Sequence, residues 1–278
     1  MQKFILGVFL IISAPAISQE LFVFSEPASN IPARSISVKL TDHLVPYDRV
    51  YARSANRFMP ELMLGFHKKF MMHIGGSFSN MHTSHFKGES IFIYGKYRFL
   101  SADEVHQHFR MAVFAMASQT NAPFHFDEVS LMGDRSGIEA GLIATQLWNK
   151  FALSGTVSHT EVLNKSRFDD VVYVPERIYR VMDGSISAGY LLFPREYTNY
   201  KQVNVNFYIE LLAQQALGQP KHYIDLAPAV QLIFNSNAKL NMGYRVQLGS
   251  TMQRMTVNSW LISFERTFLN ALKFKKRR

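Results

Sequence analysis

Residues 239–248 read Lys-Leu-Asn-Met-Gly-Tyr-Arg-Val-Gln-Leu, a strict alternation of polar and apolar side chains. Residues 203–211 alternate in the same way, with Val, Val, Phe, Ile and Leu at every second position. A period of two is the side-chain period of a β-strand, whose successive side chains point to opposite faces, and it does not suit a helix. Each segment therefore has one apolar and one polar face.

About a dozen segments of this kind follow one another, which predicts strands near 34–41, 60–67, 71–80, 89–100, 107–118, 136–148, 151–160, 185–193, 202–214, 222–234, 238–249 and 257–268. Their lengths suit tilted strands that cross a bilayer. Strands in lipid must form a closed sheet, because an open edge would leave backbone groups unpaired. We therefore predict an all-β fold, a closed antiparallel up-and-down transmembrane β-barrel of about twelve strands over 34–268. A water-soluble β-sandwich or lipocalin-like barrel, with its apolar face inward, is the competing fold.

Loop lengths and aromatic residues give the barrel an orientation. Long gaps such as 42–59, 119–135 and 161–184 alternate with short ones such as 149–150 and 235–238. Outer-membrane barrels have long external loops and short periplasmic turns, so both ends of the barrel domain are expected on the periplasmic side. Several aromatic residues lie near strand ends, where interfacial girdles form: Phe66, Tyr97, Phe99, Trp148, Phe234, Trp260, Phe264 and Phe268.

The segments that flank the barrel carry targeting and charge signals. Residues 1–18 resemble a secretory signal peptide, with Lys3, a short apolar run and the small residues before Gln19. We expect residues 19–33 to be a periplasmic N-terminal segment and residues 269–278 a basic C-terminal tail. The net charge of +9 is concentrated in that tail, so the barrel itself is close to neutral and a nucleic-acid partner is not expected. The chain has no cysteine, which excludes a lipoprotein anchor, disulfides and thiolate chemistry.

If the apolar faces contact lipid, the opposite faces line the lumen. The charged lumen-lining residues are then five positive and five negative: Lys39, Lys96, Arg98, Arg110, Arg245, Glu61, Glu139, Glu210, Asp225 and Glu265. A pore that selects one sign of ion carries rings of one charge, so this balance argues against strong ion selectivity. Two outcomes stay open: a narrow pathway for small solutes, and a lumen sealed by ion pairs, since an unpaired desolvated charge is costly.

Two motifs suggest other chemistry. The Met- and His-rich segment 71–85 offers imidazole and thioether groups that bind copper or zinc, although its spacing matches no closed ligand set. His82 and Ser84 have the two-residue spacing of an interfacial phospholipid hydrolase, in which the base activates the hydroxyl, but no Asn lies on the next strand. We therefore expect no catalytic residue, no resident metal and no cofactor. Residues 123–137 can form either a solvated outer loop or one that folds into the lumen.

In its signal, strands, loop pattern and lack of cysteine, the chain resembles the twelve-stranded outer-membrane barrels of Gram-negative bacteria, especially the transporter-like barrels of Bacteroidota. The resemblance implies export to the outer membrane, contact with outer-membrane lipids and with the assembly machinery, and passive passage of an unidentified small solute. Such barrels usually end on an aromatic residue. Here Phe264 and Phe268 can serve, although residues 270–278 continue beyond them.

Overall fold

A computed structural model describes residues 22–46, 54–123, 126–163, 178–194 and 202–272. The expected signal peptide and the basic residues after 272 lie outside this range. The described chain forms twelve strands: β1 (Ser35–Val45), β2 (Ala55–His67), β3 (Phe70–Ser79), β4 (Lys87–Asp103), β5 (Gln107–Thr120), β6 (Gly137–Trp148), β7 (Phe151–Val162), β8 (Arg180–Phe193), β9 (Asn204–Ala216), β10 (His222–Phe234), β11 (Ala238–Ser250) and β12 (Asn258–Phe268).

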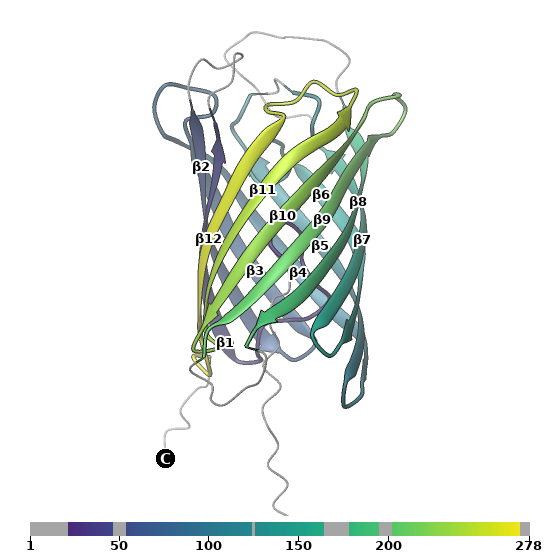
Figure 1. Ribbon diagram of the computed structural model, residues 1–278. Coiled ribbons are helices and arrows are strands. Elements are labelled where there is room, and N and C mark those ends of the chain that lie inside the picture. The colour runs from purple at the N-terminus through teal and green to yellow at the C-terminus, as the bar shows by residue number, and fades with distance from the viewer. Residues whose placement is uncertain (1–21, 47–53, 124–125, 164–177, 195–201, 273–278) are drawn as a thin grey trace, which may run out of the picture.

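The strands form one closed antiparallel barrel in which every strand pairs with its sequence neighbours and β1 pairs with β12 (Figure 1). The closing seam is long, since nine residues of β1 from Ile36 to Leu44 have partners on β12. Lys39 is paired on one side with Glu61 of β2 and on the other with Glu265 of β12. The predicted fold class is thus confirmed, and closure leaves no strand edge unpaired.

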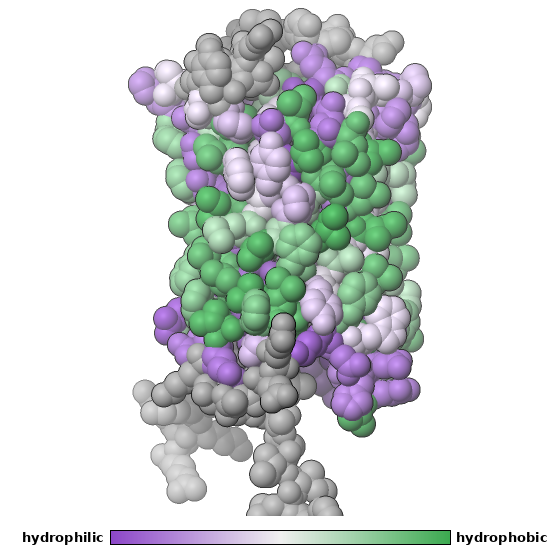
Figure 2. All heavy atoms as spheres, in the orientation of Figure 1, coloured by the Kyte–Doolittle hydropathy of each residue, from purple (hydrophilic) through white to green (hydrophobic). Residues whose placement is uncertain are grey.

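The outer face of the barrel is apolar. Side chains such as Ile91, Ile186 and Leu248 are at least 60% exposed, and Figure 2 shows a hydrophobic band between two hydrophilic rims. The alternating residues on the opposite face are buried and mostly polar, for example Asn204, Asn206 and Glu210 of β9. A water-soluble barrel would have the reverse arrangement, so the competing prediction is wrong.

Strand boundaries agree with the sequence prediction within about two residues except at a few ends. The second strand begins at Ala55 and not at the predicted residue 60. The prediction began too late because Pro60 interrupts the sequence pattern, although it does not interrupt the sheet. Pro60 points outward on an otherwise regular strand. The eighth strand begins at Arg180 and not at the predicted residue 185. The prediction began too late because Asp183 and Gly184 obscure the alternation of apolar and polar residues.

Short turns connect the strands at one end of the barrel. Asn149 and Asn235 have φ of 49° there, a left-handed conformation that asparagine tolerates better than most residues. The described C-terminal end of the chain lies at the same end (Figure 1), where the Leu272 N–H donates to the Arg34 carbonyl at 3.0 Å. The loop-length rule for outer-membrane barrels predicts that this end is periplasmic, and we call it the periplasmic end and the opposite one the external end. Among the described residues, no helix has the length and apolar character to cross a bilayer.

Candidate functional site

The lumen contains a segment that precedes the barrel. Residues 22–33, here called the N-terminal arm, have no regular secondary structure and turn back into the barrel before β1. Phe22 is buried against Tyr208 of β9, with ring centroids 5.5 Å apart. Ala28 is fully buried beside Ala112 of β5 and Ile143 of β6. The prediction of a periplasmic segment at 19–33 did not anticipate this position, because the arm is held by residues that lie far away in sequence.

Glu210 of β9 is the main anchor of the arm. Its carboxylate accepts hydrogen bonds from the backbone N–H groups of Val23, Phe24 and Ser25, each at 2.9 Å. It also accepts the Ser187 hydroxyl at 3.0 Å, and its side chain is completely buried. Hydrogen bonds to an ionised acceptor are roughly twice as strong as neutral ones. A single buried carboxylate therefore satisfies three consecutive amides of the arm.

Further contacts fix the arm along its length. The Lys96 ammonium donates to Glu26 at 2.8 Å and to the Pro27 carbonyl at 2.7 Å. The Ala28 N–H donates to Thr145 at 2.9 Å. The wall leaves space for the backbone: a Cβ at Gly243 would overlap the Phe24 ring, and one at Gly65 would overlap the Pro32 carbonyl.

A second insertion enters from the external end. It consists of the described part of residues 121–136, here called the β5–β6 loop. Val129 and Gln214 of β9 exchange two hydrogen bonds, at 2.9 and 2.8 Å. Asp134 forms an ion pair with Arg57 of β2, which also binds Glu89 of β4 at 3.0 Å. Of the two outcomes left open by the sequence, the structure therefore has the inward-folded loop.

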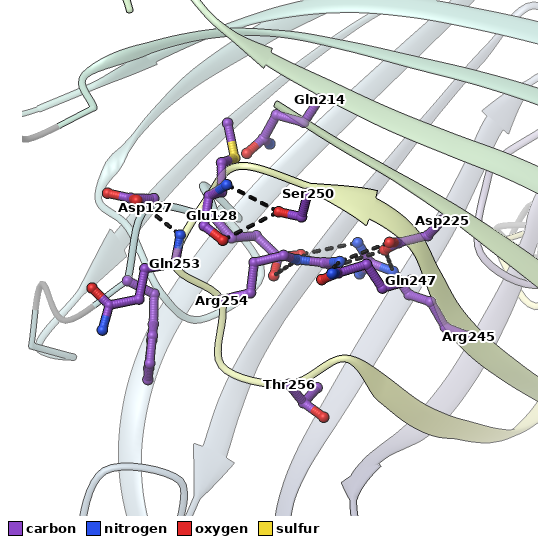
Figure 3. Close-up of polar contacts among 12 residues, drawn as sticks. Asp127, Glu128, Gln214, Asp225, Arg245, Gln247, Ser250, Gln253, Arg254 and Thr256 are labelled. Carbon is purple, nitrogen blue, oxygen red and sulfur yellow. Dashed lines mark hydrogen bonds and ion pairs between the residues drawn. The ribbon is translucent and has the colours of Figure 1, made fainter. Parts of the chain in front are cut away.

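The loop between β11 and β12, residues 251–257, closes the same opening. Its Arg254 donates to Asp225 of β10 at 2.7 Å and to Glu128 of the β5–β6 loop at 3.0 Å, as Figure 3 shows. Arg245 of β11 joins the same two carboxylates. Both guanidiniums stack on Tyr223, with Arg254 4.1 Å from the ring centroid. Two arginines and two carboxylates thus connect both loops to the wall.

The pKa values of the loop residues reflect this network. Burial raises the pKa of Glu128, but the charges of Arg245 and Arg254 outweigh burial and hold the pKa below its ordinary value. Burial likewise opposes ionisation of Asp134, yet Arg57 keeps the pKa of Asp134 well below its ordinary range. Burial lowers the pKa of Arg135 to about 10, so this guanidinium remains charged at neutral pH. Glu128, Asp134 and Arg135 are therefore charged at neutral pH.

Between the two insertions the lumen holds a cavity of about 360 Å³. The arm contributes Phe24 and Glu26, and the β5–β6 loop contributes residues from Phe126 to Arg135. Strands β4 and β5 supply apolar residues such as Phe92, Phe114 and Met116. The adjacent strands β6 to β8 supply polar residues such as Glu139, Ser158 and Asp183. The barrel interior thus holds a partly open cavity that is narrowed by two non-covalently held insertions.

The ten charged residues predicted to line the lumen fall into three groups in the structure. Lys96, Glu210, Asp225 and Glu265 are fully buried, and Glu61 is 9% exposed. Lys39, Glu139 and Arg245 are partly buried on the same inward face. Arg98 and Arg110 lie at the periplasmic rim, where Arg98 donates to the Lys68 carbonyl and Arg110 binds Asp103 and Ser29. The insertions recruit five of them, Lys96, Arg110, Glu210, Asp225 and Arg245.

Sequence reasoning missed several residues of the interior. Arg57 lay in a predicted loop, Glu89 was the first residue of a predicted strand, and Asp183 lay two residues before one. Lys239 begins the stretch quoted above and pairs with Glu265 at 3.4 Å. Extending the alternation outward from the predicted strands would have found Arg57 and Asp183, and Lys239 already lay on the inward face of its predicted strand. Glu89 has the opposite parity to Lys96 and is buried because the register shifts between β3 and β4, which the alternation does not reveal. Glu26 and Arg254 carry no such signal, because they lie outside strands.

The residues of the two alternative motifs, His73, His82 and Ser84, have different surroundings. The imidazole of His82 is 5% exposed and lies inside the external mouth near Glu89 and Asp134, whereas Ser84 is exposed. The lipid-facing His and Ser pair of an interfacial hydrolase is therefore not assembled. In segment 71–85, His73 contacts Glu61 at 2.8 Å and Glu26 at 3.6 Å, and these three residues could hold a metal ion. Lys96 already neutralises Glu26, which weakens the affinity of this group for a cation.

Scans of the sequence against protein-family models and against curated proteins give no match. Solved structures do match. An outer-membrane channel from Pseudomonas putida F1 has a TM-score of 0.56 and 11% identity, over 89% of this chain and 100% of that one. The β-domain of the Bordetella autotransporter Brka has a TM-score of 0.47 and 10% identity, over 84% and 98%. At this identity the first similarity concerns the fold, which is that of bacterial outer-membrane β-barrels.

Proposed function

We propose that this protein is an outer-membrane channel for small solutes, and that the N-terminal arm and the two external loops are its closures. One observation supports this most directly: the segments that obstruct the barrel are held by hydrogen bonds, ion pairs and side-chain packing around a cavity of about 360 Å³. The chain has no cysteine that could fix these segments covalently. The outer-membrane channel of similar fold adds a functional precedent.

Conduction would require displacement of at least one closure. The arm is connected to the wall by the anchors at Glu210, Lys96 and Thr145. The external loops are connected mainly through Glu128, Asp134 and Arg254. Each closure can leave without breaking the sheet, because neither contributes a strand to the barrel. The pathway would be passive, with the solute moving down its gradient.

Conductance across a planar lipid bilayer tests the proposal. Wild-type protein is expected to give brief, low-conductance openings, and a variant lacking residues 22–31 is expected to give larger and longer ones. Folding of both is checked by circular dichroism and by the mobility of unheated samples on SDS gels. A folded deletion variant that never conducts would overturn the channel function.

A sealed structural barrel is the second candidate function. The observation that favours it is the pairing of charges near the external opening. Arg57, Arg245 and Arg254 each form an ion pair with a carboxylate there. Persistent electrical silence in both proteins would leave this function in place.

We also propose the export route and the relationship that the sequence suggests: cleavage before Gln19, contact with the outer-membrane assembly machinery, and kinship with the transporter-like barrels of Bacteroidota. The mature N-terminus, measured by mass spectrometry of protein from outer-membrane fractions, tests the first of these. Retention of residues 1–18 would contradict it.

A further inference from the structure

One wall of the cavity places an aromatic surface directly beside two carboxylates. The strands β3 to β8 are consecutive neighbours in the barrel (Figure 1). Their register forms one row around the wall, in which His73 is paired with Tyr94, Tyr94 with Met116, Met116 with Glu139, and Glu139 with Thr160. Ser158, two residues before Thr160, is paired with Asp183. Apolar and acidic groups thus meet within a few strands.

The apolar half of this row is built from aromatic rings in contact with one another. The His73 and Tyr94 rings have centroids 4.8 Å apart, and Tyr94 and Phe114 are stacked at 5.5 Å. Met116 packs in the same buried cluster, to which Leu131 of the β5–β6 loop also belongs. Ring faces attract organic cations through their quadrupoles, and thioether and aromatic groups also bury the apolar part of such a ligand.

The acidic half lacks basic partners. Glu139 accepts the Ser158 hydroxyl at 2.7 Å. Asp183 accepts Thr160 at 3.2 Å and the Gln214 amide at 2.7 Å. The ion pairs formed within the described chain include neither carboxylate, whereas the arginines that line the cavity bind Glu89, Asp134, Asp225 and Glu128. Buried carboxylates are normally paired, so this part of the wall has a deficit of positive charge.

A third observation is independent of charge. His73 is 2% exposed and lines the cavity, and its Nε2 atom has no hydrogen-bond partner among the residues that the structure describes. Its Nδ1 atom is already engaged by Glu61 at 2.8 Å. A buried ring nitrogen without a partner is uncommon and requires an explanation. A bound molecule with a polar group at each end, one of them reaching His73, would supply one.

From these features we infer that the cavity is a binding site for a small organic amine, with its ammonium group at Glu139 and Asp183 and its apolar body against Met116, Phe114 and Tyr94. This inference rests on the proposed channel function, because the amine would be the solute that passes. A volume of about 360 Å³ falls within the usual range for small-molecule sites, roughly 300–1,000 Å³. A hydrated inorganic cation fits less well, because half of the wall offers it no oxygen ligand.

Binding of matched probes to detergent-solubilised protein, measured by isothermal titration calorimetry, tests the inference. The probes are 2-phenylethylammonium, the neutral 2-phenylethanol and the anionic 3-phenylpropionate, which differ mainly in charge. We expect the ammonium probe to bind at least tenfold more tightly than the other two. Equal binding of the three probes, or tighter binding of the anion, would overturn the inference.

Variants locate the site. The Glu139→Gln, Asp183→Asn double variant keeps the hydrogen-bonding shape and is expected to lower affinity for the ammonium probe at least tenfold. The matched control is Glu161→Gln, which removes a carboxylate from the outer surface of β7, the strand between β6 and β8, where Glu161 pairs with Arg180. The control is expected to bind like wild type. Unchanged affinity in the double variant, or an equal loss in the control, contradicts the site.

The two proposals can fail separately. If the protein conducts but does not bind the ammonium probe, the channel function stands and the amine site is wrong. If the protein binds the probe with the predicted charge preference but never conducts, the site stands as a binding site in a sealed barrel and the channel function is wrong.

Discussion

The anchoring of the N-terminal arm by Glu210 leads to a quantitative prediction. The carboxylate accepts three arm amides in the barrel interior. Replacing Glu210 by Ala leaves these three N–H groups without acceptors while the arm stays in place. Each buried donor that loses its partner costs about 1–3 kcal/mol. The docked arm is therefore destabilised by roughly 3–9 kcal/mol, since the undocked arm can bond to water.

Even the lower figure has a large effect on populations. Because about 1.4 kcal/mol corresponds to a tenfold change, a loss of about 3 kcal/mol raises the undocked fraction of the arm at least 100-fold, until it saturates. Glu210→Gln should give a smaller increase, because its carbonyl oxygen can still accept two of the three amides. The predicted order is therefore wild type, then Glu210→Gln, then Glu210→Ala.

Cysteine labelling measures this fraction, since the chain has no native cysteine. Ser29→Cys places a nearly isosteric thiol on the arm at a position that is 5% exposed. The rate of its reaction with a maleimide should follow the undocked fraction and increase in the predicted order. Glu265→Gln is the matched control, because Glu265 is a buried lumen carboxylate that bonds Ser37 instead of the arm. Labelling of the Glu210→Ala variant at the wild-type rate would refute this account of the anchor.

Four further predictions concern the loops, their pH dependence, the lipid face and the motif at His82. Replacing Arg254 by Met removes the guanidinium that joins Asp225 to Glu128. Single-channel recordings should then show more frequent openings than wild type. An unchanged open probability would argue against the β11–β12 loop as a closure. The pKa of Glu128 is depressed in the inserted loop, so ionised Glu128 stabilises the inserted state at pH values above its ordinary pKa of 4.5. This stabilisation is lost as pH falls toward the depressed pKa. The frequency of openings should therefore be constant between about pH 6 and 8 and increase only in strong acid, and a rise near pH 7 would contradict the assignment. Leu62→Arg on the apolar belt should lower the free energy of unfolding in lipid vesicles by roughly 2–4 kcal/mol, while Leu62→Ile should have little effect. Phospholipid hydrolysis should be absent from both wild type and Ser84→Ala, and release of fatty acid by wild type alone would restore the enzymatic hypothesis.

The barrel could be predicted from the sequence because the alternation that identifies each strand is a local pattern. Alternation within β9 or β11 identifies a strand and its inward face from about ten residues, and lipid on one side enforces that pattern along each strand. Pro60 shows the limit of this reasoning, since it interrupts the sequence signal without interrupting the sheet.

The contents of the lumen were not predictable in the same way. The arm reads Phe-Val-Phe-Ser-Glu-Pro-Ala-Ser-Asn-Ile-Pro-Ala over residues 22–33, with no period that assigns a face. Its position depends on Glu210, more than 180 residues away, and on space left by Gly65 and Gly243. The alternation identified Glu210 as inward-facing but could not indicate that its partners are backbone amides. Long-range recognition of an irregular segment has no signature within a single sequence.

The position of the arm has a consequence for biogenesis. The β1–β12 seam joins the first and last strands, so the cylinder is complete only after β12 has been synthesised. The arm directly precedes β1, yet its docking partners are on β4, β5, β6 and β9. Until those strands are assembled, the arm has nothing to dock against. The arm can therefore fill the interior only after strands β4 to β9 have come together, and an assembling barrel has an unobstructed interior until then.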